Sequence, residues 1–273
     1  FIASCDKSVP ACLMGLARLD MPSIVITGGV MDAGPDLLTL EQIGMYSAMC
    51  QRGEITDEKL TYYKHHACPS CGACSFMGTA STMQIMAEAL GLMLPGSALM
   101  PATCEDLKEM AYKAGKQVME LVKKGIKVSD IVTEKAFENA IMVHAAISGS
   151  TNSLLHIPAM AHELGIEIDA DTFDRMHRGA HYLLDIRPAG KWPAQFFYYA
   201  GGVPAVMEEI KSMLHLDVMT VTGKTLGENL EELKQNGFYE RCGKWLSEFN
   251  SRYGVALTKE DIIRPYDKAI GTD

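Results

Sequence analysis

The chain has 273 residues, of which 48% are hydrophobic and 22% charged, and its formal net charge is −9 at pH 7. So acidic a composition argues against nucleic acid as a partner, because nucleic acids are bound mainly through clustered lysine and arginine. We find no apolar stretch long enough to cross a bilayer and no signal-peptide pattern, so we expect a cytoplasmic protein without a membrane partner, whose eight cysteines are metal ligands or reduced thiols.

The first elements that the sequence predicts form a βαβ unit. A short apolar stub ends a strand, and a helix follows with Ser8 as its N-cap and Pro10 in its first turn, where a missing N–H costs nothing. The apolar run at 23–27 indicates a buried strand that ends in two glycines, Gly28 and Gly29. Because ligands of parallel sheets gather beyond the carboxyl ends of the strands, we expect Cys5 and these glycines to open onto one edge.

The tripeptide Cys5-Asp6-Lys7, at the turn between this strand and helix, carries both soft and hard metal ligands. Thiolates bind iron, zinc or copper(I), whereas carboxylates bind magnesium, calcium or manganese. A helix N-terminus also lowers the pKa of a nearby thiol. The tripeptide therefore indicates two different metals acting on one substrate; the plainer alternative makes Cys5 a small buried side chain and Asp6 a turn residue.

A second cluster of cysteines has the spacing C-x2-C-x2-C. Cys68, Cys71 and Cys74 begin like a bacterial ferredoxin motif, but the fourth cysteine and its following proline are absent, and no histidine pair completes a zinc site. We therefore expect Cys74 to join Cys5 across space, and the other two cysteines to be bystanders. An amphipathic helix over 79–90, ended by a glycine, would place its N-terminus near the Cys74 thiolate.

The rest of the chain alternates helices with short strands. Ser150 and Thr151 precede one of these helices, where they could cap its N-terminus or bind a substrate carboxylate. The pattern predicts an α/β fold, with a mainly parallel sheet flanked by helices in three layers, as one domain over residues 1–273. Helical patterns cover residues 108–124, 137–147 and 154–164, and a helical insertion is expected within 234–259.

Several longer motifs make the chain similar to the dihydroxy-acid dehydratase and 6-phosphogluconate dehydratase family, over essentially its whole length and in the family's order. Members of this family remove water from sugar acids or from branched 2,3-dihydroxy acids. The matching stretches are Cys5-Asp6-Lys7-x-x-Pro10, Gly28-Gly29, Cys74-x-x-Met77-Gly78-Thr79-Ala80-Ser81-Thr82-Met83, Glu88-Ala89-Leu90-Gly91, Leu94-Pro95-Gly96, Gly149-Ser150-Thr151-Asn152, Pro188-Ala189-Gly190, Gly201-Gly202-Val203-Pro204-Ala205 and Thr220-Val221-Thr222-Gly223-Lys224-Thr225.

The resemblance implies roles for the residues of the first two motifs. It makes Cys5 and Cys74 two of three ligands of an iron–sulfur cluster, with 2Fe–2S favoured over 4Fe–4S. It makes Asp6 a magnesium ligand, and Lys7 a carbamylated lysine that binds the same magnesium. The third cysteine lies upstream in the family, and the serine base lies on a C-terminal β-rich domain. We therefore expect this chain to be an internal piece of a longer polypeptide, lacking that domain and with no catalytic residue of its own.

The reaction implied is that of a hydro-lyase, which converts a 2,3-dihydroxy acid into a 2-keto acid with the cluster as Lewis acid. Segments 185–190 and 198–204 resemble the sugar-acid branch, which favours an aldonic acid. The alternatives are a branched-chain 2,3-dihydroxy-acid dehydratase of valine and isoleucine synthesis and a non-catalytic iron–sulfur carrier. Ser148 stands where the family usually has glycine, a change that would alter the substrate pocket. The family is oligomeric, so we expect a homodimer or homotetramer, with the helices at 137–147 and 154–164 in subunit contacts.

Overall fold

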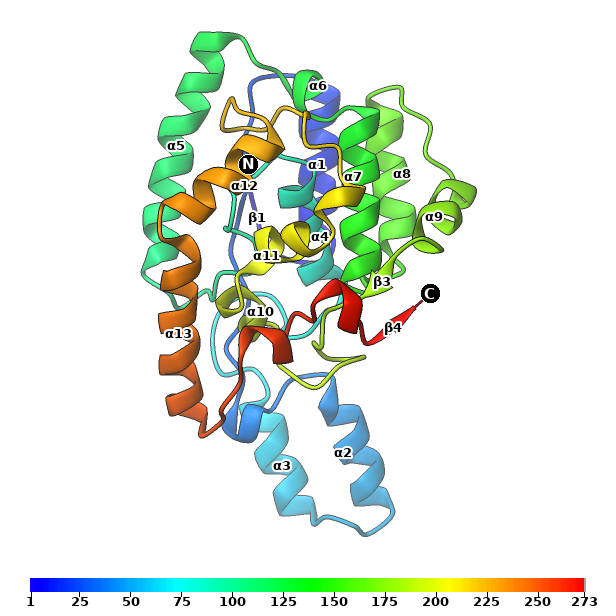
Figure 1. Ribbon diagram of the computed structural model, residues 1–273. Coiled ribbons are helices and arrows are strands. Elements are labelled where there is room, and N and C mark those ends of the chain that lie inside the picture. The colour runs from blue at the N-terminus through cyan, green and yellow to red at the C-terminus, as the bar shows by residue number, and fades with distance from the viewer. Residues whose placement is uncertain (273) are drawn as a thin grey trace.

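A computed structural model describes residues 1–272 and shows helices arranged around a small parallel sheet (Figure 1). The strands are β1 (Ile2–Ala3), β2 (Ile26–Thr27), β3 (His181–Tyr182) and β4 (Gly271–Thr272). The helices are α1 (Ser8–Leu19), α2 (Gln42–Gln51), α3 (Asp57–His66), α4 (Thr79–Ala89), α5 (Asp106–Lys124), α6 (Val128–Ile131), α7 (Glu134–Ala146), α8 (Ser153–Glu163), α9 (Ala170–His177), α10 (Gln195–Tyr199), α11 (Gly202–Glu209), α12 (Leu226–Gln235) and α13 (Phe238–Tyr253).

The predicted βαβ unit is present, which confirms the α/β class. Strands β1 and β2 pair in parallel, with Ile2 opposite Ile26, and α1 connects them. The sheet is smaller than the sequence suggests, because much of the predicted strand at 23–27 bonds to loops instead: the Val25 N–H donates to the Leu92 carbonyl at 2.8 Å. Val30 adds isolated parallel bridges to Ala73 and Pro101, which bring three loops to the carboxyl end of the sheet.

The turn before α1 is closed by a serine hydroxyl, although not as a helix cap. Lys7 occupies the N-cap position and Ser8 is the first helical residue, so the predicted cap at Ser8 is wrong. The Ser8 Oγ instead accepts hydrogen bonds from the backbone N–H groups of Cys5 at 2.9 Å and Ser4 at 3.3 Å. This hydroxyl turns back toward the loop, and thereby holds the backbone around Cys5 in a tight turn.

Helix α4 is buried on every side, which contradicts the amphipathic helix expected at 79–90. Every residue of α4 except Thr79 is buried, polar ones included. Its polar side chains face the surrounding loops rather than solvent, and each of them meets a hydrogen-bonding partner there. These contacts are Ser81 Oγ to the Cys74 carbonyl (3.3 Å), the Ser150 N–H to Thr82 Oγ1 (2.9 Å), Gln84 Nε2 to the Ser4 carbonyl (2.9 Å), and the Gly96 and Ala98 N–H groups to the Glu88 carboxylate (2.7 Å each).

Helix α7 is also internal: from Phe137 to Ala146 only Glu138 is not buried, so it offers little surface for the subunit contact expected of residues 137–147. Helix α8 packs beside α1 and leaves Leu154 and Leu155 exposed at its start. Helix α13 accounts for the predicted helical insertion. Within residues 1–272, none of the helices combines the length and apolar character needed to span a membrane.

Helices α2 and α3 form a hairpin that extends away from the rest of the fold (Figure 1). Neither helix has a buried residue. The two helices hold each other through half-buried side chains, including the rings of Tyr46 and Tyr63, which stack with centroids 4.2 Å apart. At its base, Arg187 Nη1 donates to Thr39 Oγ1 at 3.0 Å and to Gln42 Oε1 at 2.9 Å.

The buried carboxyl group of Glu88 should make stability depend on pH. Burial raises its pKa to about 7 from the ordinary value of 4.5, although the backbone N–H groups around it act in the opposite direction. Because this pKa is higher in the folded chain than in the unfolded chain, the stabilising contribution of Glu88 is complete below pH 4.5 and is lost as the pH rises through 7. The free energy of unfolding should be measured by urea denaturation for the wild type and for Glu88→Gln. The value for the wild type should fall by roughly 2 kcal/mol relative to that of the variant between about pH 5 and pH 8.

Glu105→Gln is the matched control, because the side chain of Glu105 is 84% exposed. The difference in unfolding free energy between this variant and the wild type should stay constant over the same range. An equally constant difference for Glu88→Gln would contradict the assignment of a raised pKa to Glu88.

Candidate functional site

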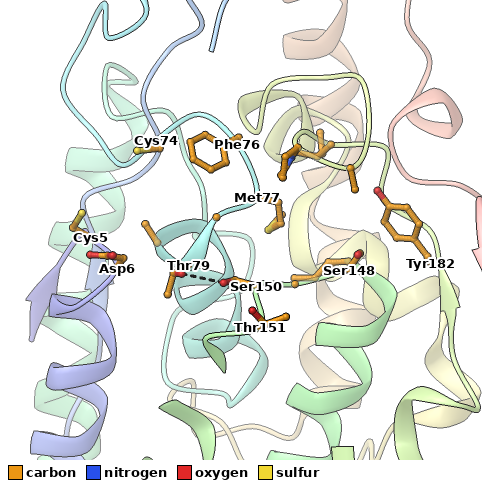
Figure 2. Close-up of a pocket in the computed structure, with 17 residues that line it drawn as sticks. Cys5, Asp6, Cys74, Phe76, Met77, Thr79, Ser148, Ser150, Thr151 and Tyr182 are labelled. Carbon is orange, nitrogen blue, oxygen red and sulfur yellow. Dashed lines mark hydrogen bonds between the residues drawn. The ribbon is translucent and has the colours of Figure 1, made fainter. Parts of the chain in front are cut away.

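A cavity of about 610 Å³ opens where the loops that follow β1, precede α4 and precede α8 come together (Figure 2). Cys5 and Asp6 lie at one end and Tyr182 at the other. Five of the six site residues predicted from the sequence line this cavity, and Lys7 does not. The five are Cys5, Asp6, Cys74, Ser150 and Thr151.

The tripeptide at residues 5–7 lies on the edge of the sheet, as expected. The backbone N–H of Gly28 donates to the carbonyl of Ala3 at 2.9 Å, and a Cβ on Gly28 would stand 2.6 Å from Ser4 Oγ and 3.0 Å from Ser4 Cβ, so a larger residue would have to displace Ser4. Asp6 reaches the cavity with its side chain 47% exposed. Lys7 Nζ lies 3.8 Å from Asp6 Oδ2 and is 72% exposed in its side chain, outside the cavity lining.

The thiol of Cys74 lies in a half-buried position above the same cavity (Figure 2). Burial raises its pKa, and the neighbouring thiols of Cys5 and Cys68 raise it further. The lowered pKa expected for a Cys74 thiol near the N-terminus of α4 is therefore wrong for this structure, because burial raises the pKa instead. Cys68 lies close enough to act on Cys74, although the sequence makes it a bystander.

Ser150 belongs to a hydrogen-bonded group of side chains on the cavity floor. Thr79 Oγ1 lies 3.0 Å from Ser150 Oγ and accepts a hydrogen bond from Asn152 Nδ2 at 2.8 Å. Ser150 Oγ also accepts from the backbone N–H of Asn152 at 3.3 Å. Helix α8 starts at Ser153 with Asn152 at its N-cap position, so neither Ser150 nor Thr151 is the cap residue.

A buried histidine supports this floor from behind. His144 Nε2 lies 3.1 Å from the Ser150 carbonyl, which can only accept, so this nitrogen carries the proton. His144 Nδ1 then accepts from His177 Nε2 at 3.3 Å. Burial is the main cause that lowers the pKa of His144 to about 4, so the ring is neutral near pH 7. At Gly149 a Cβ would stand 2.5 Å from the His144 ring, which explains the glycine. The sequence alone gives His144 no role, because a single histidine in an apolar helix carries no distinctive spacing.

The cavity lining is mainly apolar, which was not foreseen from the sequence pattern. Its apolar side chains include Phe76, which lies beside Cys74, together with Met77 and Ile186, and Tyr182 and Ser148 supply hydroxyl groups at the end opposite Cys5. Ser148 has φ +49°, a left-handed conformation that side chains rarely adopt. A glycine at this position would fit the same backbone without strain.

The donor atoms at the cavity fit part of a metal-binding site. Two thiols and a carboxylate match a soft and a hard metal respectively. Three buried polar atoms of residues adjoining the site have no hydrogen-bond partner within residues 1–272, namely Ser75 Oγ, Gln84 Oε1 and His156 Nε2. Among these same residues, however, no three His, Cys, Asp or Glu side chains converge as a metal site would require. The described chain therefore offers the right ligand types but an incomplete set.

Comparisons with known proteins agree with the geometry. The family described as dihydroxy-acid/6-phosphogluconate dehydratase N-terminal matches residues 1–229. The chain is 46% identical to a dihydroxy-acid dehydratase of Acetivibrio thermocellus over 96% of this chain and 48% of that protein. It is also 46% identical to one of Caldicellulosiruptor saccharolyticus over 97% of this chain and 50% of that protein. The chain thus spans about half the length of these curated relatives.

The hydrogen bond from His144 should hold the loop that carries Ser150. His144→Leu removes the donor and should speed amide hydrogen exchange in residues 149–152 by about tenfold, since a lost buried hydrogen bond costs about 1–3 kcal/mol. His144→Gln keeps an N–H donor at a similar reach and should exchange at close to the wild-type rate. Equal exchange rates in the wild type and both variants, measured by mass spectrometry, would show that this hydrogen bond does not hold the loop.

Proposed function

The chain belongs to the dihydroxy-acid/6-phosphogluconate dehydratase family, and on that premise we propose that the protein containing it is an iron–sulfur-dependent hydro-lyase. Its reaction is the removal of water from a 2,3-dihydroxy carboxylic acid, which leaves a 2-keto-3-deoxy acid. The C2 proton and the C3 hydroxyl leave together as water, and the enol that remains becomes the ketone. Neither oxidant nor reductant is required.

The single observation that carries this proposal is the composition of one cavity. The thiols of Cys5 and Cys74 and the carboxylate of Asp6 share it with the hydroxyl of Ser150. A hydroxy acid is a small anion with several oxygen atoms, and this cavity offers it both metal-type ligands and hydrogen-bond donors.

The hydrogen bonds on the cavity floor give Ser150 a defined direction. Its Oγ accepts from the Asn152 N–H and, when Thr79 donates, from the Thr79 hydroxyl as well. Thr79 Oγ1 accepts from Asn152 Nδ2, which leaves its own proton free to be donated to Ser150. In that arrangement the acceptor capacity of Ser150 is used, and its hydroxyl donates its own proton into the cavity. We assign this donor to an oxygen of the substrate.

The iron–sulfur cluster and the magnesium ion that the family implies would be bound by different residues of the chain. Cys5 and Cys74 would hold the iron–sulfur cluster, and Asp6 with carbamylated Lys7 would hold magnesium, with the remaining ligands supplied from outside these 272 residues. When bound, these groups would supply Lewis-acid assistance to loss of the hydroxyl and stabilise negative charge on the substrate oxygens. The chain's own part is to place the substrate between Ser150 and the ligand end of the cavity, and to shield it with Phe76 and Met77.

The experiment that tests the function is an assay of anaerobically purified full-length protein for 2-keto acid formation. 2,3-Dihydroxyisovalerate and a panel of aldonic acids should be supplied separately with magnesium. We expect keto acid from at least one of them, with the sugar-acid arm favoured by segments 185–190 and 198–204. Protein that contains iron and sulfide but releases no keto acid from any of these acids would be an iron–sulfur carrier instead.

The two cysteines should be needed for iron. Replacing either one (Cys5→Ser or Cys74→Ser) in the full-length protein should lower bound iron and sulfide, and the visible absorption of the cluster, at least severalfold, because serine is a much poorer iron ligand than thiolate. Cys50→Ser is the control, since Cys50 lies on the distant α2 hairpin with Sγ 3.1 Å from Asp57 Oδ1. Wild-type iron content in both site variants would rule out the assignment.

Lys7 should be needed for magnesium. Lys7→Arg keeps the positive charge but cannot be carbamylated, so magnesium-dependent turnover should fall by at least a hundredfold and titration calorimetry should detect weaker magnesium binding. Lys64→Arg, on the exposed face of α3, should leave both quantities unchanged. Unaltered magnesium affinity in Lys7→Arg would remove Lys7 from the site.

A further inference from the structure

Tyr182 occupies the end of the cavity opposite Cys5 and Asp6, and its phenol oxygen is turned toward the cavity (Figure 2). Its backbone is fixed on strand β3, which pairs antiparallel with β4 so that Tyr182 lies opposite Gly271. The Ile270 N–H donates to the Tyr182 carbonyl at 2.8 Å. The side chain is thus presented from a strand rather than from a free loop, which restricts where its hydroxyl can point.

The Tyr182 hydroxyl is an unused hydrogen-bond donor. Across residues 1–272, no side chain or backbone group forms a hydrogen bond with it, and the half-buried side chain lines the cavity. Burial raises the pKa of Tyr182 to about 12, and the charge of Asp185 adds to the effect, so the group keeps its proton at any physiological pH. A protonated donor that faces a cavity is suited to binding a ligand oxygen.

Ser148 places a second hydroxyl on the same part of the lining. Its backbone has φ +49°, a strained conformation for serine that surrounding contacts must stabilise. The cavity lining also includes the buried side chains of Met77, Ile147 and Ile186, which offer no hydrogen bonds of their own. The hydroxyls of Tyr182 and Ser148 are the polar groups that Figure 2 labels at this end.

We propose that Tyr182, assisted by Ser148, is a specificity-determining residue that hydrogen-bonds a hydroxyl group on the substrate carbons beyond C3. The inference rests on the proposed function, which places C2 and C3 at the Cys5–Asp6 end and directs the rest of the substrate along the cavity. It favours a polyhydroxylated acid over one with a branched alkyl tail. An alkyl tail would leave the phenol without water and without a partner, and sites built to bind a hydroxyl discriminate strongly against analogues that lack it.

The test is Tyr182→Phe in the full-length holoenzyme, assayed with a six-carbon aldonic acid and with 2,3-dihydroxyisovalerate. We expect kcat/KM for the aldonic acid to fall by about 10- to 100-fold, mainly through KM, and kcat/KM for the alkyl substrate to stay the same or rise. Ser148→Ala should act in the same direction with a smaller effect. Tyr62→Phe, on the exposed face of α3, is the control and should change neither substrate.

Each other outcome has a defined meaning. An equal fall in kcat/KM for both substrates would mark Tyr182 as merely structural. An unchanged kcat/KM for the aldonic acid would remove Tyr182 from the site. Either result overturns the inference. Wild-type activity on 2,3-dihydroxyisovalerate alone would also overturn it while leaving the proposed function intact. A wild-type holoenzyme inactive on every dihydroxy acid would defeat the proposed function itself.

Discussion

The arrangement of this domain depends on satisfying the polar groups of one buried helix. Helix α4 has no solvent-facing side, yet it carries serine, threonine, glutamine and glutamate side chains. Each such group, left without a partner, would cost about 1–3 kcal/mol. The partners come from four different loops: the one at Ser4, the one at Cys74, the one at Gly96 to Ala98, and the one at Ser150. A requirement of polar burial therefore brings together segments that lie far apart in the sequence.

Three of these four loops carry residues of the cavity, which links stability directly to the site. Gln84 holds the backbone immediately before Cys5, Ser81 bonds to the carbonyl of Cys74, and Thr82 accepts from Ser150. The candidate ligands lie on loops, as expected for groups that must reach a substrate. Hydrogen bonds to one helix, α4, hold these loops in place. His144 adds a further contact to the Ser150 carbonyl, so the floor at Ser150 is fixed both by α4 and by α7.

The sequence predicted the parts of the fold and site that depend on local chemistry. The βαβ unit, the end of α4 before Gly91 and the meeting of Cys5 with Cys74 all follow from spacing and turn residues. The amphipathic helix expected at 79–90 is wrong because of burial: polar residues in α4 suggested a solvated face, whereas this helix lies inside, as does the apolar α7. The roles of Tyr182 and His144 could not be predicted from the sequence, because these roles arise only when distant segments fold together.

The α2–α3 hairpin is held to the rest of the domain by few buried contacts. Because neither helix buries a residue, separating the hairpin from the body exposes little apolar surface, and its opening equilibrium is set locally rather than by global unfolding. Arg187 joins its base to the loop whose next residues, Pro188 and Ala189, form the rim of the cavity. Opening of the hairpin frees that guanidinium. The lining of the cavity is thereby connected to a pair of helices that have no buried residue.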